Sequence, residues 1–162
     1  MILLDTNVVS EPIRRHPDSR VLDWLDAQVI ETLYLSTVSL GELLSGVENL
    51  PVGRRRTALA AALERQIADL FDDRIISFDI AAAEAYAKAV ARARSQGHAI
   101  SIADGQIAGI ATSRDLRVAS LDETPFRAAG LTVINPWRPS PRRRHSVCPN
   151  SWRASKSLLG ML

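Results

Sequence analysis

Four acidic residues stand where the chain is expected to pass from a strand into a helix. Asp5 follows an apolar run at residues 1–4, Glu42 and Asp104 lie in the first turns of two predicted helices, and Asp122 follows a short apolar segment. If the strands are parallel, all four meet at the carboxyl edge of the sheet, where open α/β folds bind ligands. Two carboxylates about 5 Å apart repel by roughly 3 kcal/mol at an effective dielectric constant of 20. Such a cluster persists only where protons or cations neutralise it.

Carboxylate oxygens are hard ligands that select Mg²⁺ or Mn²⁺, and the chain has no set of Cys and His residues that would favour a softer metal. Metal ions held by carboxylates activate water and stabilise charge on a phosphoryl centre, as in two-metal nucleases and polymerases. The residues alone therefore predict a Mg²⁺- or Mn²⁺-dependent phosphoryl or phosphodiester site.

Three of the four acids, taken singly, also have simpler explanations. Ser39-x-x-Glu42 and Ser101-x-x-Asp104 match the capping box, in which an acid stabilises a helix N-terminus by about 1 kcal/mol. Asp122 could be a turn residue or a helix N-cap. No capping box explains an acid at position 5, so Asp5 is the strongest evidence for a metal site.

Short apolar segments alternate with longer amphipathic ones along the chain. Strands are predicted at residues 1–5, 33–36, 75–76, 118–120 and 131–134, and helices at 8–15, 37–50, 54–71, 79–95 and 123–129, with two more that begin at 18–19 and at 101. This alternation predicts a central parallel sheet of about five strands with right-handed crossovers, in a three-layer α/β/α sandwich.

The charge is divided unevenly between two parts of the chain. Residues 138–162 contain six basic residues and no acidic ones, whereas residues 1–137 carry 14 basic and 18 acidic groups, a net charge of −4. We therefore predict one compact domain at 1–137 and a basic Pro/Arg/Ser-rich tail at 138–162 that is mostly disordered. The composition of this mildly acidic domain alone does not indicate a basic face that would bind nucleic acid.

The lengths of the apolar runs and the cysteine content indicate the cellular compartment in which the protein is expected. No apolar run approaches the roughly 20 residues that span a bilayer, so we expect no membrane association. The single cysteine, Cys148, excludes an internal disulfide and fits a reducing cytoplasm.

Several segments of the chain resemble PIN-domain ribonucleases, and in particular the VapC and FitB-like toxins of bacterial type II toxin–antitoxin pairs. The resemblance rests on Met-Ile-Leu-Leu-Asp5-Thr6-Asn7, Leu-Ser-Thr-Val-Ser-Leu-Gly-Glu42-Leu, Ile100-Ser-Ile-Ala-Asp104 and Leu-Thr-Val-Ile-Asn135-Pro136-Trp137. It spans residues 1–137 in order and leaves the tail out.

The resemblance implies a Mg²⁺- or Mn²⁺-dependent endoribonuclease that cuts RNA, often transfer or ribosomal RNA. It also implies a cognate antitoxin that blocks the site and a homodimer formed through helices beside the sheet. Asp5, Glu42 and Asp104 match the family's three strongest acidic positions, and Asp122 matches a fourth that is Asp or Asn. Pro125 stands where a further acid often lies, so we expect Asp122 to take over its role.

On this resemblance, Asp5 and Asp104 would hold the main metal, while Glu42 and Asp122 would complete the cage and position the attacking water. Thr6, Asn7 and Ser120 are further candidates to orient ligands or water. The three arginines at 54–56 could grip phosphates, although a solvated first turn of a long helix explains them equally well.

Other classes remain open from the residues. An aspartyl-phosphate phosphatase needs Asp-x-Asp after its first strand, but Asn7 occupies the second position, and Lys88 and Lys156 are the only lysines. A receiver-like module also needs a lysine near a strand end. A dinucleotide site would need Gly-x-Gly-x-x-Gly, which is missing. A non-catalytic PIN-like scaffold that binds RNA or protein is the serious alternative to the ribonuclease.

Overall fold

The structure is a computed structural model that describes residues 1–138. Apart from Arg138, the tail that was predicted to be disordered lies outside the described residues. The elements in chain order are β1 (Ile2–Leu4), α1 (Thr6–Ser10), the 3₁₀ turn η1 (Glu11–Ile13), α2 (Ser19–Asp26), η2 (Ile30–Thr32), β2 (Leu33–Ser36), α3 (Thr37–Glu48), α4 (Arg54–Phe71), β3 (Ile75–Ile76), α5 (Ile80–Ser95), α6 (Ile102–Ser113), β4 (Arg117–Ala119), α7 (Thr124–Ala128) and β5 (Val133–Ile134). No helix in this part of the chain is long and apolar enough to cross a membrane.

The five strands form one parallel sheet in the order β3-β2-β1-β4-β5, which confirms the predicted fold class. β1 lies in the middle, and its three residues pair with β2 on one side and with β4 on the other. All three are almost fully buried, because helices cover both faces of the sheet. This explains why the strand is apolar without alternation.

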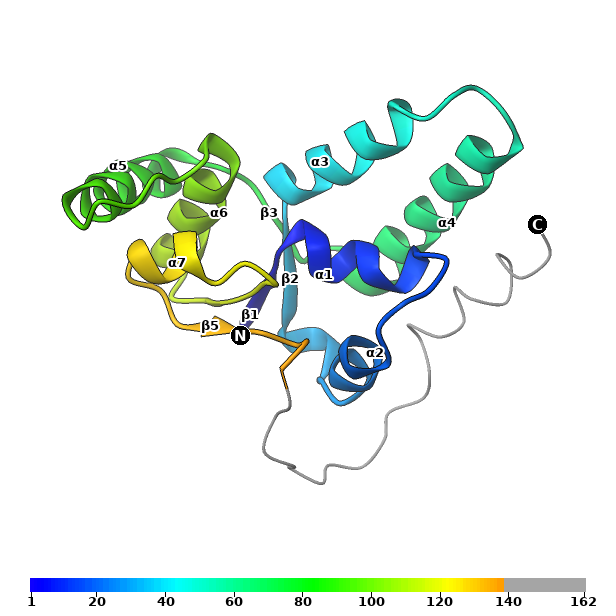
Figure 1. Cartoon of the computed structure of the whole chain (residues 1–162), viewed down its shortest axis with the longest axis horizontal. Coiled ribbons are helices and arrows are strands. Elements are labelled where there is room, and N and C mark those ends of the chain that lie inside the picture. The colour runs from blue at the N-terminus through cyan, green and yellow to red at the C-terminus, as the bar shows by residue number, and fades with distance from the viewer. Residues whose placement is uncertain (139–162) are drawn as a thin grey trace.

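Two hydrophobic clusters occupy the two faces of the sheet. Figure 1 shows α1–α4 on one side of the strands and α5–α7 on the other. Ile2 and Leu4 belong to a cluster that includes side chains of α1, α2, α3 and α4. Leu3, whose side chain points the other way, belongs to a cluster with α5, α6 and α7. Successive strand side chains point to opposite faces, so a single strand serves both cores.

The first helix differs from its prediction at residues 8–15. It begins at Thr6, with Asp5 as its N-cap, and residues 11–13 tighten into a 3₁₀ turn. Pro12 accounts for the change because it lacks an N–H and its ring clashes with the preceding turn of an α-helix. The predicted strands at 1–5 and 131–134 are also shorter in the structure, at Ile2–Leu4 and Val133–Ile134.

Close packing of α5 against α6 fixes the helix that carries Asp104. A Cβ atom on Gly109 would lie 2.5 Å from the carbonyl oxygen of Ala82, and one on Gly105 would lie 2.7 Å from the ring of Tyr86. The two glycines therefore let the helices approach more closely than any larger residue would allow. Asp104 directly precedes this contact, so its position depends on it.

Candidate functional site

The strand order changes direction between β1 and β4, and Asp5 lies at that point. From β1 the chain adds β2 and β3 on one side, then crosses to place β4 and β5 on the other. Ligands in open α/β sheets bind outside the carboxyl ends of the strands at such a switch point. Asp5 follows β1, and Ser120 follows β4, so two polar side chains meet at this crevice.

The Asp5 carboxylate is buried, with only 6% of the residue exposed, and three donors hold it. Oδ1 accepts a hydrogen bond from the backbone N–H of Thr6 at 2.8 Å. Oδ2 accepts from Asn7 Nδ2 and from the Ser120 hydroxyl, each at 2.6 Å. Its Oδ1 also caps α1, a role that the sequence-based prediction, which considered only a capping box, left out. The cap uses one oxygen and leaves the buried charge without a cation among these partners.

Burial raises the pKa of the Asp5 carboxyl above its usual value, and the negative charges of Asp104 and Glu42 raise it further. The hydrogen bonds from Ser120 and Thr6 act in the opposite direction but do not cancel the effect. The two other acids therefore lie within electrostatic reach of Asp5, as the sequence predicts. A divalent cation would relieve all three costs at once.

Glu42 is exposed on α3 and is not part of a capping box. The N-cap of α3 is Ser36, whose hydroxyl accepts from the backbone N–H of Ser39. The Glu42 carboxylate instead accepts a hydrogen bond from the Thr6 hydroxyl at 2.5 Å, on the residue next to Asp5. The simpler explanation for this acid is thereby removed.

Asp104 lies in the first turn of α6, and Ser101 is the N-cap. The Ser101 hydroxyl accepts from the backbone N–H of Asp104 at 3.0 Å and approaches the Asp104 carboxylate at 2.7 Å. The helix start thus holds the carboxylate in place, and its charge contributes to the raised pKa of Asp5. Capping and ligand binding are compatible here, because one serine hydroxyl leaves most of the carboxylate's acceptor positions open.

Asp122 is exposed in the loop after β4, where its carboxylate accepts from the backbone N–H of Thr124 at 3.1 Å. This is the turn geometry of the simpler reading. The acids whose charges raise the pKa of Asp5 are Asp104 and Glu42, and Asp122 is not one of them. Pro125, at the position where a further acid was missing, is buried at the start of α7.

Within residues 1–138, no three His, Cys, Asp or Glu side chains are already gathered around a point where a metal ion could sit. Glu42 is turned to Thr6, and Asp104 to Ser101. To share one ion, the exposed Glu42 and the half-buried Asp104 would rotate about their side-chain bonds.

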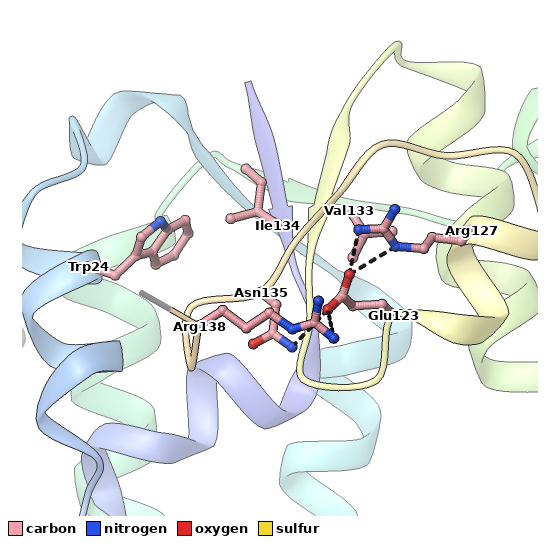
Figure 2. A pocket seen from close by; sticks show the side chains of 7 residues that line it. All are labelled: Trp24, Glu123, Arg127, Val133, Ile134, Asn135 and Arg138. Carbon is pink, nitrogen blue, oxygen red and sulfur yellow. Dashed lines mark hydrogen bonds and ion pairs between the residues drawn. The ribbon is translucent and has the colours of Figure 1, made fainter. Parts of the chain in front are cut away.

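Sequence reasoning missed a second buried acid, Glu123, beside this site (Figure 2). One carboxylate oxygen accepts from Arg127 Nε and Nη2 at 2.8 and 2.5 Å. The other accepts from Asn135 Nδ2 at 3.1 Å and lies 3.0 Å from Arg138 Nη2. Hydrogen bonds from Arg127 lower the pKa of Glu123, and Asn135 and Arg138 add to the effect. The i,i+4 spacing of Glu123 and Arg127 was the only local signal for it.

The basic residues at 54–56 form the first turn of α4, where Arg56 pairs with Glu48. Because Glu48 already partly balances this charge, the solvated-helix explanation gains weight for this segment. These arginines stay predicted phosphate contacts, and none of the site interactions above includes them.

Comparison with known proteins agrees with the geometry. The PIN domain model matches residues 2–131 of the chain. Over 140 residues the chain is 46% identical to "VapC ribonuclease Y4jK" of Sinorhizobium fredii, with 86% of this chain and 100% of that protein covered. It is 44% identical to "Toxin FitB" of Neisseria gonorrhoeae, with 85% and 99% covered. The crystal structure of FitAcB from the same organism superposes with a TM-score of 0.81, at 44% identity and with 85% and 99% covered.

The parallel five-strand sheet, the acid at its switch point and the match over most of the domain lead to one conclusion. This chain belongs to the PIN-domain family.

Proposed function

We propose that this protein is a Mg²⁺- or Mn²⁺-dependent endoribonuclease, the toxin of a toxin–antitoxin pair, that hydrolyses RNA phosphodiester bonds. The observation that carries the proposal is the buried Asp5 carboxylate, whose pKa is raised by burial and by two further acids at the switch point of the sheet. The similarity to a VapC ribonuclease and to a toxin supports the choice of RNA as substrate.

The donor set fits a hard divalent ion. Asp5, Asp104, Glu42 and Asp122 offer only carboxylate oxygens, which Mg²⁺ and Mn²⁺ prefer. Asp5 and Asp104 would hold the ion, while Glu42 and Asp122 would complete the cage. The unbalanced charge on Asp5 is the feature of this structure that such an ion would satisfy.

When bound, the metal would supply charge stabilisation at the phosphoryl group and lower the pKa of a bound water. The chain's own residues set up that chemistry before the ion arrives. Asn7 and Ser120 hold Oδ2 of Asp5 in one orientation, and the Thr6 hydroxyl holds Glu42 beside it. Ser101 does the same for Asp104. Loss of a hydrogen-bond partner of this kind commonly lowers metal affinity or activity 10- to 100-fold.

The proposal includes the remaining partners and the location. A cognate antitoxin would keep the toxin inactive, and two copies of the chain would form a homodimer. The substrate would be transfer or ribosomal RNA in the cytoplasm, where the single cysteine of the chain stays reduced.

Cleavage of total RNA by the purified protein tests the function, with Mg²⁺, without metal and with EDTA. We expect cutting only with the metal, and loss of cutting in the Asp104→Asn variant, whose melting temperature should stay close to that of the wild type. Asp115→Asn is the matched control, because Asp115 adopts a positive φ of 52° that Asn tolerates and lies beyond the far end of α6.

Three outcomes separate the candidate functions. Metal-dependent cutting that Asp104→Asn abolishes and Asp115→Asn retains supports the ribonuclease. RNA binding without cutting would indicate a non-catalytic PIN-like module instead. Phosphate release from small esters, with no cutting of RNA, would indicate a phosphatase.

A further inference from the structure

A small pocket of about 160 Å³ lies at the carboxyl edge of β4 and β5, and Figure 2 shows the side chains that line it. It is lined by Trp24, Glu123, Arg127, Val133, Ile134, Asn135 and Arg138. The residues come from α2, from the loop before α7, from α7 itself and from β5 with the residues after it. Four parts of the chain therefore converge on it.

The charge of the pocket is opposite to that of the Asp5 site. Arg127 and Arg138 both reach the Glu123 carboxylate, so the three charged side chains together carry a net charge of +1. Their side chains remain 60% and 73% exposed, whereas that of Glu123 is only 10% exposed. Glu123 thus fixes two guanidinium groups, each with N–H groups left facing solvent, in the arrangement that binds a phosphate oxygen.

The opposite wall of the pocket is apolar. Trp24 is half-buried against the core and faces the pocket across Ile134 (Figure 2). An indole ring that is partly exposed in a pocket shared with cationic side chains is a platform on which a nucleic-acid base can stack. Phosphate donors and a stacking surface together match one nucleotide of a single strand.

A chain of hydrogen bonds links the pocket to Asp5. Asn7 donates to Asp5 and accepts from the backbone N–H of Leu121 at 3.1 Å. The Leu121 carbonyl accepts from Asn135 Nδ2 at 3.1 Å, and the same nitrogen donates to Glu123. Only Asn7, Leu121 and Asn135 separate the two carboxylates, so the pocket adjoins the place where the proposed reaction occurs.

We propose that the Trp24–Arg127–Arg138 pocket is a substrate subsite that holds one nucleotide of a single-stranded RNA next to the cleaved bond. Arg127 and Arg138 bind its phosphate, and Trp24 stacks on its base. This inference rests on the ribonuclease function proposed above for its link to cleavage, and Glu123 acts as a positioning residue for the two arginines.

Salt-dependent RNA binding tests the subsite. The probe is a fluorescently labelled 12-nucleotide RNA of random sequence, titrated at constant Mg²⁺ with the Asp104→Asn chain so that it is not cut. Arg138→Gln and Arg127→Gln should each lower the slope of log Kd against log salt by about 0.7, and raise Kd about fivefold at 0.1 M salt. Trp24→Leu should raise Kd about fivefold or more with an unchanged slope, and Trp24→Phe should restore binding.

Arg117→Gln is the matched control, because it removes the same charge from an exposed residue at the amino end of β4, whereas the pocket lies at the carboxyl end of the strands. Melting temperatures verify that every variant is folded. Slopes and Kd values for Arg138→Gln and Arg127→Gln that equal those of Arg117→Gln would overturn the subsite. Cleavage by the otherwise wild-type chain is measured separately. If that chain does not cut RNA, the proposed function fails, and the binding slopes still decide the subsite.

Discussion

Asp5 and Glu123 are buried acids at the same edge of one sheet, yet the chain treats them in opposite ways. Burial and neighbouring negative charges raise the pKa of Asp5, whereas hydrogen bonds from Arg127 lower that of Glu123. The exposed fractions are similar, 6% and 9%. The difference therefore comes from the partners: Glu123 has two guanidinium groups, and Asp5 has neutral donors and other acids.

This contrast separates an acid that positions two arginines from an acid that is prepared for a metal ion. A chain that can place arginines on Glu123 could also have placed one on Asp5, only three linking residues away. Among residues 1–138, no cationic side chain pairs with Asp5, and this costs stability because a buried charge is expensive unless it is paired. Sites that store such a cost are commonly functional. We infer that a bound cation balances the charge of Asp5.

The largest expected effect is on cleavage. Asp5→Asn should reduce metal-dependent RNA cutting by about 10³-fold, since several kcal/mol of charge stabilisation are lost with the metal. Glu123→Gln, which changes an equally buried acid, should stay within about tenfold of the wild type at saturating RNA. Initial cutting rates of the two variants measure the contrast directly. Equal losses in both would remove the distinction between the two acids.

A smaller effect is expected when a neutral partner of Asp5 is removed. Ser120→Ala deletes the hydroxyl that donates to Asp5 at 2.6 Å and should lower activity about 10- to 100-fold. Ser113→Ala is the matched control, because this serine donates only to a backbone carbonyl at the far end of α6. Activity at increasing Mg²⁺ concentration measures both variants. Unchanged metal dependence in Ser120→Ala would show that this hydrogen bond does not tune the site.

Stability should respond to Glu123 in the direction of its lowered pKa. A depressed carboxyl pKa contributes stability above the unfolded value of 4.5, and this contribution is lost as the pH falls through the folded value. Glu123→Gln should therefore cost about 1–2 kcal/mol at pH 7, because its partners are largely exposed, and less at pH 3. Urea unfolding at the two pH values measures this. A cost that does not shrink in acid would mean that packing, not charge, is lost.

Asp5 should show the opposite sign and the smallest effect. Its pKa is raised above 3.8, so the metal-free protein loses stability as the pH rises through the folded value. Without metal, Asp5→Asn should thus be more stable than the wild type at pH 7, by about 1 kcal/mol. Saturating Mg²⁺ should reverse the order, because only the wild type gains binding energy. Calorimetric unfolding with and without Mg²⁺ tests both halves; an unchanged order on adding Mg²⁺ would contradict the account.

The sequence predicted those features that depend on local patterns. The unbroken apolar run before Asp5 indicated a central parallel strand, and alternation of short and long segments indicated the sandwich. Where a neighbour decides the outcome, it was less reliable. The N-cap of α3 is Ser36 rather than Ser39, and α1 begins at Thr6, with only its cap Asp5 between it and the end of β1. Local propensity leaves both details open.

Glu123 was missed for a different reason. Its lowered pKa depends on Asn135 and Arg138, which follow β5 and meet Glu123 only because β4 and β5 are paired. No sequence spacing encodes that contact. The same limit applies to Asp5: the sequence indicated that its carboxylate needs a partner, but the hydrogen bond from Ser120 exists only because β1 and β4 are paired.

The central claim is that Asp5 and Asp104 hold one divalent ion, with Glu42 and Asp122 completing the cage. Anomalous X-ray scattering from crystals grown with Mn²⁺ tests it most directly, because it locates the ion without assuming a mechanism. The account predicts a strong peak within bonding distance of the Asp5 and Asp104 carboxylates, with Glu42 turned toward it from Thr6. An empty crevice at saturating Mn²⁺, or an ion bound elsewhere, would contradict it.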